Sequence, residues 1–226
     1  MLLVIPEVLS AAEVAAMRER LEQADWQDGR QTAGYAAIDQ KSNLQLQVRD
    51  PLAVELGQRI LQALSTDPRF ISFALPGKIL SPMFNCYRGG GEYGFHIDNA
   101  IRVDPLGGDR IRTDVSTTLF LSDPGDYDGG ELVVSGTYGV ETVKLPAGHA
   151  VVYPGTSLHR VTPVSRGQRL AAFFWTQSMV QDETQRNLLY ELDCTIQQLA
   201  LRPENRTEVV RLTGVYHNLV RGWAQV

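Results

Sequence analysis

A histidine and an aspartate stand two positions apart in the stretch YGFHIDNA, as His96 and Asp98. In a strand, residues i and i+2 project from the same face, so both side chains could reach one metal ion. A second histidine, His159, follows a Pro-Gly turn in YPGTSLHRVTPV, 61 positions after Asp98. Two histidines and one carboxylate form a facial triad that binds Fe(II) and leaves coordination positions open for reactants. We therefore predict a metal site here, although the same ligands suit other divalent ions, and His159 taken alone could be a polar strand-end residue.

An arginine lies ten positions after His159, in SRGQRLAAFFWTQS. If this stretch is a strand, Arg169 shares one face with Phe173 and Trp175, because their spacing is even. A cation at the end of an apolar face is costly to bury unless it is paired. A dicarboxylate ligand would pair it, since a guanidinium binds a carboxylate through two parallel hydrogen bonds. The alternative is a solvated arginine at the end of the strand, like neighbouring Arg166.

Helical patterns flank a β-rich centre that would position these residues. Near the start, Ser10 and Glu13 form a capping-box pattern before an amphipathic run, and a second helix is predicted over residues 51–65. From about residue 70 to 180, short β-rich runs, among them KILSPMFNCY at residues 78–87, alternate with turn clusters such as RGGGE, PLGGD and DPGDYDGG. This alternation of short strands and turns favours a β-sandwich or barrel. After that, apolar residues at helical spacing predict two further helices, one before Pro203 and one after it.

Composition places the chain among globular proteins. With 226 residues, 43% hydrophobic and 21% charged, it can bury a sizeable core, either as one large domain or as one domain with an appendage. A net charge of −5 does not favour nucleic acid as a partner. The two cysteines form no disulfide framework, the N-terminus makes a poor signal peptide, and no stretch approaches the length of a membrane span. We predict a cytoplasmic protein.

Several stretches together resemble one family. They are YRGGGEYGFHIDNA, RTDVSTTLFLSDPGDYDGGELVV, LPAGHAVVYPGTSLHRVTPVSRGQRLAAFFWTQSMV, and, in the tail, LYELD and VYHNLVRGWAQV. The chain resembles the bacterial PKHD-type hydroxylases, a family of Fe(II)- and 2-oxoglutarate-dependent dioxygenases related to prolyl hydroxylases. The resemblance covers essentially the whole chain. It implies a mainly β fold with flanking helices and a double-stranded β-helix core of the jelly-roll or cupin-like type. We expect an N-terminal helical and strand support region over residues 1–69, the dioxygenase core over 70–180, and a helical extension over 181–226.

The resemblance also implies roles for single residues. His96, Asp98 and His159 would be the iron ligands, and Arg169 would bind the distal carboxylate of 2-oxoglutarate. Tyr87 matches a tyrosine that hydrogen-bonds this carboxylate in relatives, and its alternative is core packing. Trp175 matches an aromatic residue near the iron or packs in the core. The roles of four further residues stay open: Cys86, Asn99, His149 and His217.

The predicted activity is hydroxylation of an unidentified substrate, with conversion of 2-oxoglutarate and O₂ to succinate and CO₂ and with ascorbate as the reductant that keeps the iron reduced. The resemblance points to a small-molecule or peptide substrate and to an association with iron uptake. From the charge and the lack of a long apolar stretch, we expect neither nucleic acid nor a membrane as partner. Two alternatives remain: a non-redox cupin-like metal-binding protein, and a sensor of iron or 2-oxoglutarate. A homo-oligomer, formed through the C-terminal helices, is also left open.

Overall fold

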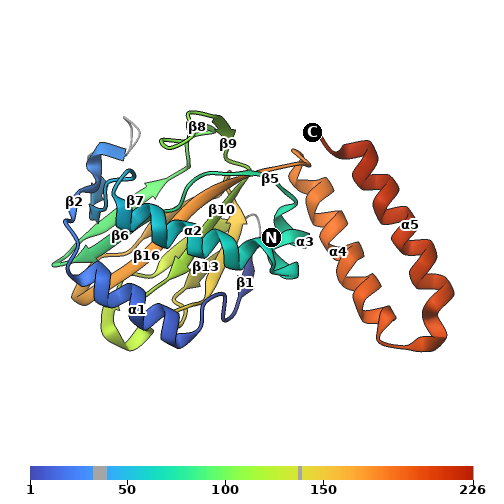
Figure 1. Ribbon diagram of the computed structural model, residues 1–226, viewed down its shortest axis with the longest axis horizontal. Coiled ribbons are helices and arrows are strands. Elements are labelled where there is room, and N and C mark those ends of the chain that lie inside the picture. Colours follow the sequence, from blue (N-terminus) through green and yellow to red (C-terminus); the bar gives the residue numbers. More distant parts are fainter. Residues whose placement is uncertain (33–39, 137–138, 226) are drawn as a thin grey trace.

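Two antiparallel sheets dominate the computed structural model, which describes residues 1–32, 40–136 and 139–225. The larger sheet has the order β1 (Leu3–Ile5), β14 (Ala150–Pro154), β10 (Val115–Phe120), β16 (Val164–Ser178), β6 (Met83–Arg88), β4 (Leu44–Gln45) and β2 (Gln27–Asp28). Two further strands, β5 (Pro76–Ile79) and β11 (Tyr127–Gly129), pair with β16. The smaller sheet has the order β13 (Gly139–Val143), β12 (Leu132–Gly136), β15 (Leu158–Val161), β7 (Glu92–His96) and β3 (Lys41–Ser42). A hairpin of β8 (Ile101–Val103) and β9 (Arg110–Arg112) stands beside them (Figure 1).

The central strands of the larger sheet are buried on both faces, and the two faces carry different side chains. In β10, Ser116 and Thr118 line a pocket, whereas Leu119 belongs to the main apolar core. In β16, Arg169 lines the same pocket, and its neighbour Leu170 points into that core. Since successive side chains of a strand alternate between faces, one sheet builds both the pocket and the core.

Three helices cover the outer face of the larger sheet. These are α1 (Ala11–Glu22), α2 (Pro51–Ser65) and α3 (Pro68–Ala74), and Figure 1 shows α1 and α2 lying across the strands. The predicted capping box is confirmed: the Ser10 hydroxyl accepts from the Glu13 backbone at 3.3 Å, and the Glu13 carboxylate accepts from the Ser10 backbone at 2.9 Å. The helix predicted over residues 51–65 is also confirmed.

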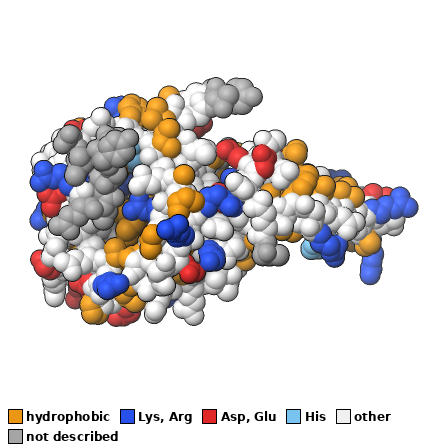
Figure 2. All heavy atoms as spheres, turned by 90° about the horizontal axis from the view of Figure 1, so that it is seen from above, with side chains coloured by type: hydrophobic (Ala, Val, Ile, Leu, Met, Phe, Trp, Pro, Cys, Tyr) orange, Lys and Arg blue, Asp and Glu red, His pale blue; other side chains and the backbone are white. Residues whose placement is uncertain are grey.

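The C-terminal segment forms a helical hairpin that projects from the sheets, as both views of the molecule show (Figure 1, Figure 2). Helix α4 (Glu183–Ala200) packs against α3 and against the antiparallel α5 (Arg206–Trp223). A small apolar cluster of Leu75, Val180 and Leu189 anchors the hairpin, and half-buried side chains of α5 surround it. No helix in the described part of the chain is both long and apolar enough to cross a membrane.

The predicted jelly-roll core flanked by helices is confirmed, but two strand predictions need correction. The run predicted over residues 78–87 divides into β5 and β6, because Pro82 stands immediately before β6 and cannot donate to a strand ladder. The stretch around the metal motif is not continuous strand either. Strand β7 ends at His96, and Asp98 lies in the loop that follows.

Candidate active site

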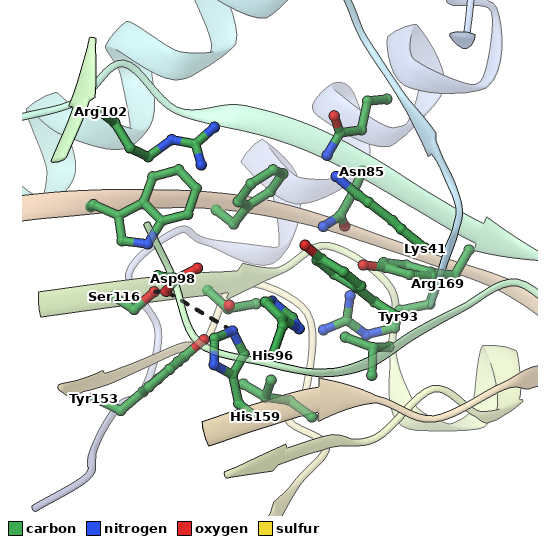
Figure 3. A pocket seen from close by; sticks show the side chains of 17 residues that line it. Lys41, Asn85, Tyr93, His96, Asp98, Arg102, Ser116, Tyr153, His159 and Arg169 are labelled. Atoms are coloured by element: carbon green, nitrogen blue, oxygen red, sulfur yellow. Dashed lines mark hydrogen bonds and ion pairs between the residues drawn. The ribbon is translucent and has the colours of Figure 1, made fainter. Parts of the chain in front are cut away.

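One pocket opens between the facing surfaces of the two sheets, and the predicted metal ligands line it. His96 at the end of β7 and His159 in β15 are cross-strand partners, which places their rings 4.2 Å apart between centroids. Asp98 completes the set from the loop: its Oδ2 lies 3.9 Å from the Nε2 atom of His159. One ligand atom from each of the three residues lies within 4.8 Å of the others. Figure 3 shows the three side chains pointing toward one another.

Backbone carbonyls orient both histidines. The Nδ1 atom of His96 lies 2.8 Å from the carbonyl oxygen of Gly94, and that of His159 lies 2.9 Å from the oxygen of Ser157. In each ring Nδ1–H donates to the backbone, so Nε2 keeps its lone pair for a metal ion. Burial and the neighbouring His159 lower the pKa of His96 to about 4. His96 is therefore neutral near pH 7, which is the form that binds a metal.

Neighbouring side chains contact the three residues of the triad and fix their positions. The Ser116 hydroxyl donates to Asp98 Oδ2 at 3.0 Å, which fixes one carboxylate oxygen. The Tyr93 ring stacks on His96 with centroids 3.6 Å apart, and the Tyr153 ring meets His159 edge-on. Because these contacts lock the ligand side chains in place, the two nitrogens and one carboxylate form a preorganised donor set that fits Fe(II).

Arg169 is the second feature of the pocket. It is 1% exposed on β16, and its guanidinium lies 5.4 Å from the ring centroid of Tyr87 and 5.1 Å from that of Phe120. Within the described residues, its Nε and Nη1 atoms have no hydrogen-bond partner. A buried cation with unused donors is costly, so this position is suited to an anionic ligand. The solvated-arginine alternative applies instead to Arg166, which is exposed and pairs with Asp128.

Tyr87 lies opposite Arg169 on the adjacent strand β6 and also lines the pocket. Its side chain is 2% exposed, and burial raises the pKa of its phenol to about 12. The phenol therefore stays protonated and can donate a hydrogen bond to a ligand. Tyr87 also belongs to an apolar cluster, so packing and ligand contact are compatible at this position.

The structure brings all five predicted site residues into one pocket: His96, Asp98, His159, Arg169 and Tyr87. Trp175 lines it too, although it is only 4% exposed. The four residues whose roles stayed open do not line this pocket. Cys86 points into the main core, His149 follows a turn, and His217 is exposed on α5.

Sequence reasoning missed several residues that line this pocket: Lys41, Asn85, Tyr93, Arg102, Ser116 and Tyr153. Ser116 carried only a weak signal, because the strand VSTTLF holds three consecutive polar residues and this run does not show which face meets the pocket. Asn85 lies two positions before Tyr87 in β6, so alternation along that strand could have indicated it. Tyr93 lies three positions before His96 in β7, and no local pattern shows that it or the remaining residues face the pocket.

Comparisons with known proteins agree with this site. Residues 82–177 match the 2OG-Fe(II) oxygenase superfamily, and residues 183–225 match the PKHD-type hydroxylase C-terminal domain. The chain is 55% identical to the PKHD-type hydroxylase PiuC of Pseudomonas aeruginosa and 55% identical to a PKHD-type hydroxylase of Bordetella pertussis, each over 100% of both chains.

Solved structures share the fold at lower identity. A prolyl-4-hydroxylase of Pseudomonas putida aligns with a TM-score of 0.58 at 24% identity, covering 78% of this chain and 92% of the other. HygX from Streptomyces hygroscopicus, solved with nickel, 2-oxoglutarate and hygromycin B, aligns with a TM-score of 0.54 at 16% identity, covering 78% and 82%.

The jelly-roll core and its His-Asp-His triad define an Fe(II)- and 2-oxoglutarate-dependent oxygenase. Within that class, the full-length similarity shows that the chain belongs to the PKHD-type hydroxylases. It is therefore an enzyme whose cofactor is Fe(II) and whose co-substrate is 2-oxoglutarate. This assignment decides against the non-redox cupin-like alternative.

Proposed function

We propose that this enzyme hydroxylates a C–H bond of an organic substrate while 2-oxoglutarate is converted to succinate and CO₂. Bound iron would supply the oxygen activation that couples this decarboxylation to insertion of one oxygen atom into the substrate. The observation that carries the proposal is the combination of three converging metal ligands with a buried guanidinium whose Nε and Nη1 are unpaired among the described residues. One part of the pocket is suited to a divalent ion and another part to a carboxylate.

Different side chains of the pocket bind the metal ion and the co-substrate. His96, Asp98 and His159 hold the ion, with Nε2 of each ring turned away from its backbone partner. Arg169 and Tyr87 bind the distal carboxylate of 2-oxoglutarate, the first through charge and the second through its phenol. The cross-strand pairing of these two residues lets them reach the same anion.

The substrate is a small molecule or a peptide. Structural neighbours of this fold include one with hygromycin B bound and a prolyl hydroxylase in complex with a peptide fragment, so the architecture accommodates both kinds of ligand. Ascorbate as the reductant and a role in iron uptake stay predictions of the family resemblance. Identification of the substrate would decide whether the enzyme has a role in iron uptake.

Arg169→Ala tests the proposed division of work. Loss of a buried, hydrogen-bonded charge pair costs about 2–5 kcal/mol. At about 1.4 kcal/mol per tenfold change, the affinity for 2-oxoglutarate should fall by roughly 30-fold or more. Affinity for iron should change much less, and Arg169→Lys should restore binding only in part, because an ammonium lacks the planar fork.

Separate calorimetric titrations of Fe(II) and 2-oxoglutarate, without O₂, measure these affinities. Arg166→Ala is the matched control, since Arg166 lies on the same strand but is exposed. It should bind 2-oxoglutarate as the wild type does. If Arg169→Ala bound 2-oxoglutarate normally, the assigned role would be wrong.

A further inference from the structure

We propose that Arg102 recognises a carboxylate of the substrate, so that the enzyme acts on an organic acid rather than on a neutral molecule. This inference rests on the proposed function and adds the substrate class. Arg102 lies on the β8–β9 hairpin, lines the active-site pocket, and stands apart from the residues that would bind 2-oxoglutarate.

The hairpin has an inner and an outer face. On β8, Ile101 and Val103 are 55% and 58% exposed, while Arg102 between them turns toward the pocket. Its cross-strand partner Ile111 is 2% exposed and packs in a cluster with Trp175. The alternation of side chains along the strand therefore directs Arg102 inward.

The hairpin is held against the body of the protein. Asp109 in its turn forms an ion pair with Lys78 at 3.0 Å, and Arg49 Nε donates to the carbonyl oxygen of Pro105 at 3.2 Å. The Asp104 carboxylate accepts from the backbone of Leu106 at 3.2 Å, which stiffens the turn. Arg102 thus occupies a defined place at the pocket.

The guanidinium of Arg102 lies over the indole of Trp175, at the wall of the pocket. Its central carbon lies 4.3 Å from the ring centroid, which is a cation–π contact. Within the described residues, the guanidinium of Arg102 makes no ion pair or hydrogen bond, and Trp175 Nε1 is a buried donor without a partner. The planar fork of a guanidinium is matched by a carboxylate, and the indole N–H offers a further donor nearby.

Arg102 and Arg169 serve different parts of the pocket. The rings of Tyr87 and Phe120 flank Arg169, whereas Arg102 contacts Trp175. Figure 3 shows the two guanidinium groups on different sides of the triad. A single 2-oxoglutarate bound through Arg169 therefore leaves the Arg102 position for another ligand.

The charges of the bound cofactors balance without Arg102. Fe(II) and Arg169 carry as many positive charges as Asp98 and the two carboxylates of 2-oxoglutarate carry negative ones. Asp98 is the carboxylate that acts most strongly on Arg102, but it is committed to the metal. The positive charge of Arg102, which lines the same pocket, is then in excess. An anionic substrate would compensate this excess in a half-buried site.

The pocket wall indicates what the carboxylate is attached to. Leu132, Val161, Phe173 and Trp175 contribute apolar surface beside the triad. A substrate with an apolar body and one acid group would contact both the wall and Arg102. Polar contacts of this kind fix orientation, and apolar walls supply most of the contact area in ligand sites.

Matched acid and amide probes test the proposal. Phenylacetate and phenylacetamide, and hippurate and its amide, are titrated calorimetrically into protein loaded with Fe(II) and 2-oxoglutarate without O₂. Loading first occupies the metal and Arg169, so a probe carboxylate cannot bind there. We expect at least one acid to bind about tenfold or more tightly than its amide, because the guanidinium pairs only with the charged group.

Three variants assign that preference to one residue. Arg102→Gln should abolish it, and Arg102→Lys should retain part of it, while both keep 2-oxoglutarate affinity within about twofold. Arg110→Gln is the control: it removes the same charge from the same hairpin at an exposed position and should keep the preference.

A second arm separates two sources of the carboxylate. Capped pentapeptides with a central Glu or Gln between alanines are titrated in the same way. A Glu preference that needs Arg102 supports an acidic peptide, and a preference confined to the small acids supports a free organic acid.

The proposal is overturned if no acid in either arm binds more tightly than its neutral partner, or if Arg102→Gln keeps the preference. It is also overturned if Arg110→Gln loses the preference equally, since the effect would then be one of overall charge. Normal binding of 2-oxoglutarate in these experiments would leave the proposed function intact, so the two failures can be told apart.

Discussion

The two sheets and the C-terminal hairpin are packed to very different degrees. Every residue of β10, Val115–Phe120, is buried, because helices cover one face of the strand and the opposite sheet faces the other. Helix α5 has no fully buried residue along its 18 positions. It contacts the rest of the chain mainly through α4 and one edge of a small cluster.

This difference separates two tasks. Side chains proposed to bind a metal or co-substrate need positions fixed by surrounding packing. The strands supply this for His96, His159 and Arg169, and Ser116 of β10 holds Asp98, which lies in a loop. An element with few buried contacts opens locally at low free energy, without unfolding the whole molecule. We therefore expect substitutions in the sheets to alter chemistry and substitutions in the hairpin to alter local stability.

Asp98→Ala should give the largest effect on chemistry. The triad loses its only carboxylate, so Fe(II) affinity should fall by more than about 100-fold, beyond the loss typical of an outer contact. Turnover of 2-oxoglutarate to succinate should be lost with it. Metal titration and a succinate assay measure both effects, and Asp25→Ala, at an exposed position, serves as the control. A variant with near-normal activity would show that Asp98 is not a ligand.

Leu189→Ala should affect the hairpin instead. Leu189 is 0% exposed in the anchoring cluster, and Leu-to-Ala changes at buried sites cost about 2–5 kcal/mol. Hydrogen exchange should quicken in α4 and α5, while β10 and β16 keep their protection and Fe(II) affinity stays within about twofold. Leu188→Ala, next to it but 55% exposed, should change stability by no more than about 0.5 kcal/mol. Faster exchange throughout the sheets would contradict the separation.

Ser116→Ala should give the smallest effect. It tests whether a side chain of the larger sheet that is not itself a ligand supports metal binding. It removes the hydroxyl that donates to Asp98 Oδ2, without altering a ligand. Loss of such an outer contact typically costs about 10–100-fold in metal affinity. Thr117→Ala, on the opposite face of the same strand, should leave Fe(II) affinity unchanged. Equal metal affinity in both variants would show that the carboxylate does not need this support.

Local patterns determined the helices and the chemical types at the site. The Ser10 capping box and Pro51 at the first turn locate helices through contacts within a few residues, so they can be read from the chain itself. His96, Asp98, His159 and Arg169 could be predicted from the sequence, because each residue type suits binding of a metal or of a carboxylate. The family resemblance then assigned them to one site. Their common pocket follows from strand pairing that agrees with this expectation.

Only the tertiary structure decided which other side chains meet at the site. Strand β7 ends at His96, so Asp98 reaches the metal position from a loop rather than from the strand face expected from its spacing. Arg102 and Ser116 become neighbours of the triad through the folding of a hairpin beside the pocket and the packing of the two sheets. The ring of Tyr93 stacks on His96 of its own strand, which the local pattern did not show. The sequence alone does not specify these contacts, because register and sheet curvature depend on the packing of the whole core.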